Sequence, residues 1–218
     1  MTTGTIEPSR EATTHASRPP VTAGRSAPVL VVENDDWLRS RMCHLLEAET
    51  GLRLAGVSES AEDAARRIEQ EPVDVAVIGH RPRSWSALRL CCELKRTPAP
   101  PAVVICSAYP DGVLAACSVV AEADALVSMY DCDAELSSVL RRVSLGARLL
   151  PAVPPRVGAM LHERLEAPEH AIFSMLLAGI PAADVARGLR MSQAELESRR
   201  STLLGKLETL PPTSRTRY

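Results

Sequence analysis

The sequence has no long apolar run, few lysines and no CxxC pair of cysteines. No stretch approaches the roughly 20 apolar residues that span a bilayer, and residues 1–27 lack the apolar segment of a secretory signal. Six cysteines are present, and none forms a CxxC pair, which argues against a zinc site. We therefore expect a cytoplasmic protein with reduced cysteines, no membrane span, no metal and no cofactor.

Positive charge is not in excess either. The chain has 25 Lys and Arg residues against 27 Asp and Glu residues, and only Lys95 and Lys206 are lysines. Any site for a nucleic acid must therefore be a local patch. The hydrophobic share of 45% and the length of 218 residues are typical of a globular chain with one medium domain and a smaller one.

Residues 28–146 alternate short apolar runs with amphipathic segments. The runs predict five strands, at 28–32, 52–57, 73–78, 102–107 and 125–129, and a helical pattern follows each of them. This order predicts a five-stranded parallel sheet of flavodoxin-like α/β class, with helices on both faces. Buried parallel strands should be continuously apolar, and VLVV, VDVAVI and AVVIC nearly are.

The second half of the chain has a different pattern. Prolines at 151, 154 and 155 indicate a linker, and helical patterns follow at 168–178, 182–189 and 192–207, the last capped by Ser192 with Glu195. Three short helices predict a small all-α helix-turn-helix domain. We expect a disordered tail at 1–27, the α/β domain at 28–146, a linker with a possible helix at 147–164, the helix-turn-helix domain at 165–210 and a tail at 211–218.

Local strings of the α/β domain carry a family resemblance. VLVVENDDWLRSRM, VDVAVIGHRP, VVICSAYPDG and ALVSMYDCDAEL resemble a response-regulator receiver domain over residues 28–146. The resemblance implies an acidic pair after the first strand that holds magnesium and a phosphoacceptor Asp after the third. It also implies a Ser or Thr after the fourth strand and a Lys after the fifth.

Few of these positions keep the family's residues. The matching pocket consists of Glu33, Asn34, Gly79, Ser107 and Met129. Gly79 stands at the phosphoacceptor position and has no nucleophile, and Met129 stands where the Lys is expected. One carboxylate without a phosphate is a poor magnesium site. His80 is an alternative acceptor, but it lacks a Lys or a metal beside it. The resemblance therefore predicts a degenerate phosphorylation pocket and no enzyme activity.

Residues 165–207 resemble the LuxR-type helix-turn-helix of NarL/FixJ regulators. The string is LEAPEHAIFSMLLAGIPAADVARGLRMSQAELESRRSTLLGKL. The resemblance implies that the third helix enters the major groove of double-stranded DNA. The residues expected at the DNA are Gln193, Glu195, Ser198, Arg199, Arg200, Thr202 and Lys206. Glu197 stands where the family usually has a basic residue, and the weakly basic segment predicts a modest affinity that depends on dimerisation.

Together, these patterns predict a transcription regulator that acts without phosphorylation. The chain is similar to atypical NarL/FixJ regulators of actinomycetes, including RedZ-like activators of antibiotic genes. The resemblance implies promoter DNA and a second copy bound through the receiver as partners, with RNA polymerase as a partner if the protein is an activator. A further hypothesis is that the receiver pocket binds a small-molecule ligand. The alternative is a protein-interaction module that sequesters another regulator.

Overall fold

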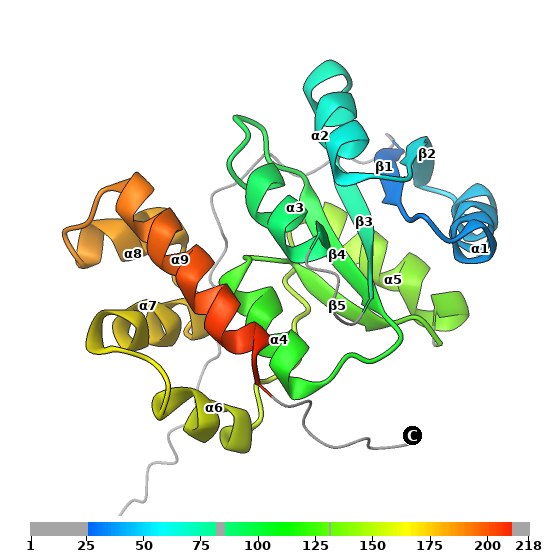
Figure 1. Cartoon of the computed structure of the whole chain (residues 1–218). Coiled ribbons are helices and arrows are strands. Elements are labelled where there is room, and N and C mark those ends of the chain that lie inside the picture. Colours follow the sequence, from blue (N-terminus) through cyan, green and yellow to red (C-terminus); the bar gives the residue numbers. More distant parts are fainter. Residues whose placement is uncertain (1–25, 82–85, 131, 211–218) are drawn as a thin grey trace, which may run out of the picture.

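The computed structural model describes residues 26–81, 86–130 and 132–210. The expected five-stranded parallel sheet is confirmed, with the strand order β2-β1-β3-β4-β5 (Figure 1). The strands are β1 (Ala27–Val32), β2 (Leu52–Ser58), β3 (Val75–His80), β4 (Ala102–Ser107) and β5 (Ala125–Ser128). Residues 1–25 and 211–218, which we expect to be tails, lie outside the described residues.

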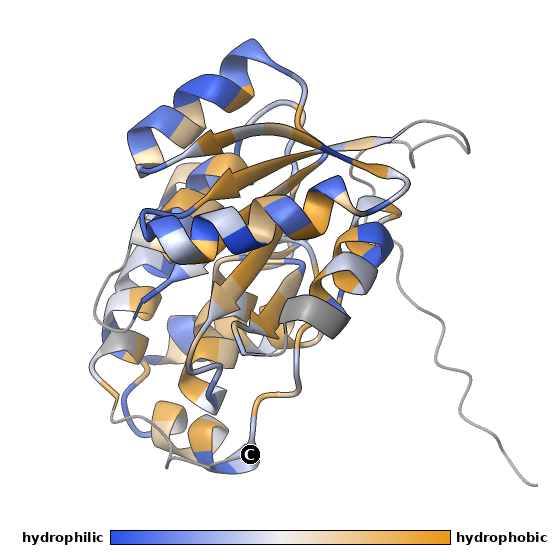
Figure 2. Cartoon of the chain, turned by 90° about the vertical axis from the view of Figure 1, so that its right-hand side faces the viewer, coloured by the Kyte–Doolittle hydropathy of each residue, from blue (hydrophilic) through white to orange (hydrophobic). Residues whose placement is uncertain are grey.

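Helices cover both faces of the sheet. They are α1 (Asp36–Glu47), α2 (Ala61–Gln70), α3 (Ser86–Leu94), α4 (Gly112–Val120) and α5 (Cys132–Ser144). Helices α1 and α5 pack on one face, and α2, α3 and α4 pack on the other. Asp35, Ser60 and Asp111 each accept a backbone hydrogen bond as N-caps of the following helix. The strands are strongly apolar, whereas most covering helices mix apolar and polar residues (Figure 2).

Four shorter helices follow the α/β domain. They are α6 (Pro155–His162), α7 (Ala167–Leu177), α8 (Ala182–Gly188) and α9 (Gln193–Glu208). Helix α9 begins after Ser192, whose hydroxyl accepts a hydrogen bond from the Glu195 amide at 3.1 Å, as the capping pattern predicts. Helices α6, α7 and α9 pack against α4, on the side of the molecule away from α1 (Figure 1). None of the described helices is long and apolar enough to cross a bilayer.

One strand differs from its predicted range in a way that matters for the pocket. The expected third strand ends at Ile78, but β3 runs on to His80 because Gly79 pairs with Cys106 and His80 with Ser107. Gly79 is therefore the penultimate residue of the strand and does not follow it. Its backbone is fixed by the sheet, and this fixes what can stand above its Cα atom.

Candidate functional site

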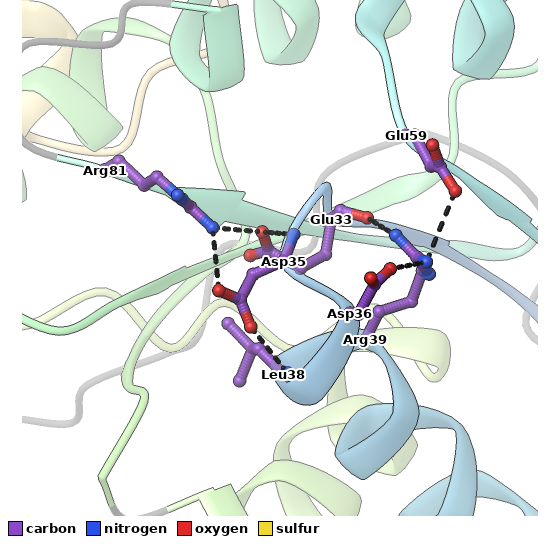
Figure 3. Close-up of polar contacts among 7 residues, drawn as sticks. All are labelled: Glu33, Asp35, Asp36, Leu38, Arg39, Glu59 and Arg81. Carbon is purple, nitrogen blue, oxygen red and sulfur yellow. Dashed lines mark hydrogen bonds and ion pairs between the residues drawn. The ribbon is translucent and has the colours of Figure 1, made fainter.

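The carboxyl edge of the sheet places the predicted pocket residues at the ends of β1, β3, β4 and β5. Glu33 directly follows β1, and its side chain is almost wholly buried. Its Oε1 accepts a hydrogen bond from the Asp35 amide at 2.8 Å and lies 3.3 Å from Arg81 Nη2. Arg81 Nη2 also lies 3.4 Å from Asp35 Oδ2 (Figure 3). One guanidinium therefore holds two carboxylates together at this edge.

Gly79 lies directly beneath the carboxylate of Glu33. A Cβ atom added to Gly79 would lie 1.8 Å from Glu33 Oε2 and 2.8 Å from Glu33 Cδ. The volume that a side chain at position 79 would need is therefore taken by Glu33. The absence of a side chain at Gly79 and the burial of the Glu33 carboxylate therefore belong to one packing arrangement.

Sequence reasoning missed the two residues that complete this arrangement. Asp35 is the N-cap of α1, and its Oδ1 accepts a hydrogen bond from the Leu38 amide at 3.0 Å. That hydrogen bond, with the added attraction of Arg81, lowers the pKa of Asp35. Arg81 carried no expected role, although a cation directly after β3 has to lie near the end of the neighbouring β1. Asn34 occupies the second position of the acidic pair that the family resemblance implies, and it is exposed.

The other pocket residues are held by their own neighbours. Ser107 is fully buried, and its hydroxyl accepts a hydrogen bond from the Tyr109 amide at 3.2 Å. Met129 is partly buried and packs on the core beneath α1 and α5. His80 is buried, and burial lowers its pKa. These residues do not fit a magnesium ion, because the carboxylates after β1 face a guanidinium and Gly79 has no side-chain oxygen.

Helix α9 presents four of the expected DNA-contacting residues along one exposed face. Glu195, Ser198 and Thr202 are exposed, and Arg199 beside them is about one third exposed. Gln193, in the first turn, is exposed as well. The Arg199 guanidinium donates to Glu195 Oε1 at 3.1 and 3.3 Å. This face carries hydroxyls, one acid and one base, in the order that the helical spacing predicts.

Arg200 lies on the opposite side of α9 and is not at the expected DNA face. Its side chain is only 2% exposed. Nε and Nη2 donate to the carbonyl of Val120 at 3.0 and 2.7 Å, and Nη1 lies 3.0 Å from Glu122 and 2.8 Å from Glu197. Burial opposes its charge, but the acids outweigh burial, with Glu122 foremost, so its pKa is raised. Arg200 contacts the receiver in this structure.

Lys206 is also held within the protein. Its Nζ lies 2.7 Å from Glu169 Oε2 and 3.7 Å from Glu166 Oε1, at the start of α7. The hydrogen bond to Glu169 raises the pKa of Lys206. The side chain of Lys206 stays partly exposed, with 29% of it accessible. Glu197, expected to oppose DNA, instead pairs with Arg200 on the receiver side of α9.

Comparison with solved structures shows the same fold in DNA-binding response regulators. The RcsB–DNA complex aligns with a TM-score of 0.55 at 14% identity, over 86% of this chain and 94% of that one. A structure of the RcsB response regulator of Salmonella typhimurium aligns with a TM-score of 0.52 at 13% identity, over 86% of this chain and 94% of that one. A LuxR-family two-component regulator of Aurantimonas sp. SI85-9A1 aligns at 0.53 and 18%, over 65% and 99%.

These likenesses define the architecture as a receiver followed by a helix-turn-helix domain. The α/β receiver fold with a small all-α domain after it, predicted from the sequence, is therefore confirmed. The structural neighbours are LuxR-type response regulators. No protein-family model matches the sequence, and no curated protein matches it.

Proposed function

We propose that this protein is a DNA-binding transcription regulator that contacts double-stranded promoter DNA through α9. The observation that carries the proposal is the exposed face of Glu195, Ser198, Arg199 and Thr202, in the N-terminal two thirds of the third helix of a helix-turn-helix. That part of a recognition helix is the one that reaches base edges in the major groove. The RcsB structure solved with DNA supports the assignment by fold.

The regulator takes no input from aspartyl phosphorylation. Gly79 supplies no nucleophile, Glu33 fills the volume above it and Met129 supplies no charge for a phosphoryl group. Arg81 already neutralises the carboxylates that would otherwise attract a metal. The amount and the assembly of the protein then decide its activity.

The DNA-binding test is a salt-dependent binding measurement on promoter fragments from the neighbourhood of the gene. Arg199→Ala is expected to weaken binding by roughly tenfold and to reduce the salt slope by about one if the guanidinium contacts a phosphate. Arg67→Ala is the matched control, because Arg67 on α2 pairs with Asp63 four residues earlier, as Arg199 pairs with Glu195. Equal effects of the two substitutions would refute the role of α9.

A second candidate is a protein-interaction module that sequesters another regulator. The observation in its favour is that the three basic residues expected at DNA all have acidic partners: Arg199 has Glu195, Arg200 has Glu122 and Lys206 has Glu169. Such pairing lowers the attraction for a phosphate backbone. Absence of sequence-specific DNA binding at low salt, together with a co-purifying regulator, would decide for this candidate.

The finer proposals follow from resemblance to RedZ-like regulators. We expect a cytoplasmic, pathway-specific activator of antibiotic or other secondary-metabolite genes that contacts RNA polymerase and binds DNA as a homodimer through the receiver. Because α6, α7 and α9 cover α4, the dimer must use another receiver surface. Genome-wide mapping of bound DNA tests the target genes, and sedimentation of the full chain tests the dimer.

A small-molecule input is the remaining proposal for the receiver. Such a ligand would have to enter the pocket at the carboxyl edge of the sheet, where Glu33 and Ser107 are buried. Binding of a pathway product must raise the melting temperature of the protein. A thermal-shift screen of the full chain that finds no stabilising product would remove this input.

A further inference from the structure

We propose that the helix-turn-helix domain stays docked on the receiver through α4, with Arg200 as the positioning residue, so that DNA is bound without separation of the domains. The docking is independent of the proposed function. The statement about DNA rests on that function, and the experiments below separate the two.

Helix α4 has no polar face that could be exposed to solvent. Its sequence GVLAACSVV carries no charge, and all residues from Val113 to Val120 are buried. A helix that is apolar all round is stable only when other elements surround it. The sheet covers one side of α4, and α6, α7 and α9 cover the rest. The sequence of α4 is therefore adapted to the docked arrangement.

One hydrophobic core runs through both domains. The cluster that contains Ile105 of β4 continues through Val120 of α4 to Leu196 and Leu207 of α9, without a break at the domain boundary. Separation of the domains would expose apolar area on both sides, and the free-energy cost grows with that area. The contact thus resembles the interior of a single domain.

The ends of α4 fit the helical domain closely. A Cβ atom on Gly112 would lie 2.8 Å from Pro154 and 3.0 Å from Val157, so the start of α4 lies against the start of α6. At the other end, Glu122 Oε1 accepts a hydrogen bond from the Ala182 amide at 3.0 Å, at the start of α8. The start of α4 therefore lies against the linker helix α6, and its other end is tied to the helix-turn-helix domain.

Arg200 closes the same contact with a buried charge. It makes two hydrogen bonds to the Val120 carbonyl and two ion pairs, one to Glu122 of the receiver and one to Glu197 of its own helix. A buried guanidinium is tolerated when its donors are paired in this way, and removal of one partner is costly. The docked domains leave Ser198, Arg199 and Thr202 at the surface for DNA.

The first test cuts the connection between the domains. A protease site is inserted between the exposed Pro151 and Ala152, and the cleaved protein is passed through a sizing column in native buffer. The two pieces are expected to elute together at the size of the full chain. Elution as separate pieces, while the uncleaved insertion protein stays folded, would overturn the docking proposal.

The second test measures Arg200 in the intact chain by denaturant unfolding. Arg200→Met is expected to lower the ratio of folded to unfolded protein by at least about tenfold. Arg199→Met, one residue along and largely at the surface, should change that ratio by no more than about twofold. Glu122→Gln should weaken folding too, with an effect that does not multiply with that of Arg200→Met. If the effects of Arg200→Met and Glu122→Gln multiply in the double variant, the two side chains are not coupled.

The third test adds promoter DNA to the cleaved protein. Both pieces are expected in the shifted complex, and Arg200→Met should leave the salt slope unchanged, unlike Arg199→Ala. A complex that contains only the helical piece, or a slope reduced by about one in Arg200→Met, would overturn DNA binding in the docked state. If no DNA binds at all, the proposed function fails, whereas the first two tests still decide the docking.

Discussion

Two arginines of this protein each lie between two carboxylates, and they differ in burial. Arg81 contacts Glu33 and Asp35 at the carboxyl edge of the sheet, with 48% of its side chain exposed. Water competes for such a cation, so each of its ion pairs contributes little to the free energy of folding. The edge is therefore held mainly by the packing of Glu33 over Gly79.

Arg200 has a similar pair of acids but only 2% of its side chain is exposed. Its partners Glu122 and Glu197 come from the two domains, and the Val120 carbonyl takes two of its donors. The contrast teaches that the same ion-pair pattern lies at the carboxyl edge of the sheet in one place and joins two domains in the other. Burial decides which of the two has a large effect.

The largest effect is expected where the buried arrangement is reversed in charge. Glu122→Lys replaces the carboxylate that lies 3.0 Å from the Arg200 guanidinium with a cation, and we expect a loss of roughly 3–5 kcal/mol in the free energy of unfolding. Urea unfolding of the full chain measures it. Glu59→Lys on the exposed pair with Arg39 is the control and should cost under about 1 kcal/mol. Similar losses in both variants would contradict the contrast.

The next effect concerns the volume above the sheet edge. Gly79→Asp puts a second carboxylate where Glu33 Oε2 lies, and we expect a loss of roughly 1–3 kcal/mol from overpacking. Incubation with a small phosphoryl donor should still give no phosphoprotein by mass spectrometry. The double variant Gly79→Asp with Glu33→Ala should regain part of the stability. Phosphorylation of the single variant would show that the pocket is still competent.

A smaller effect is expected at the exposed arginine. Arg81→Ala leaves Glu33 with the Asp35 amide as a hydrogen-bond donor, so the loss should be about 1 kcal/mol or less. Chemical unfolding at low and at high salt measures it, and the difference from the wild type should shrink with added salt. A loss as large as that of Glu122→Lys would place the two arginines in the same class.

The smallest effect concerns pH. Burial lowers the pKa of His80 below the value of 6.5 that applies in the unfolded chain. The unfolded state therefore binds more protons below pH 6.5, and the stability from neutral His80 is complete above that pH and declines as the pH falls towards the folded-state pKa. His80→Asn should flatten the stability profile below pH 6.5. The exposed His44→Asn serves as the control, and a flattening there as well would remove the assignment.

Much of the fold follows from patterns that are local in the sequence. Apolar runs gave the five strands because buried parallel strands need both faces apolar, and Ser192 with Glu195 gave the start of α9. The end of β3 was placed two residues early because Gly79 and His80 do not look like strand residues. Their strand geometry comes from pairing with Cys106 and Ser107, which no local pattern contains.

We predicted Arg200 at the DNA-facing side of α9, and the helical period could have corrected that prediction. Leu196, Arg200, Leu203 and Leu207 are spaced four, three and four residues apart, so Arg200 lies within the apolar stripe of α9. Its partner Glu122 is far away in the sequence, and no spacing rule connects the two. Arg81 was overlooked for the same reason, because its acids follow a different strand.

Glu122 has a backbone that a glycine would adopt more easily. Its φ of 59° lies in the left-handed region, which costs a residue with a side chain roughly 1 kcal/mol or more. A Glu122→Gly change would relieve that strain and at once remove the acceptor for the Ala182 amide and the partner of Arg200. The backbone conformation at position 122 thus favours glycine, whereas the contacts with Ala182 and Arg200 require glutamate. The chain carries the residue that makes the contacts between the domains.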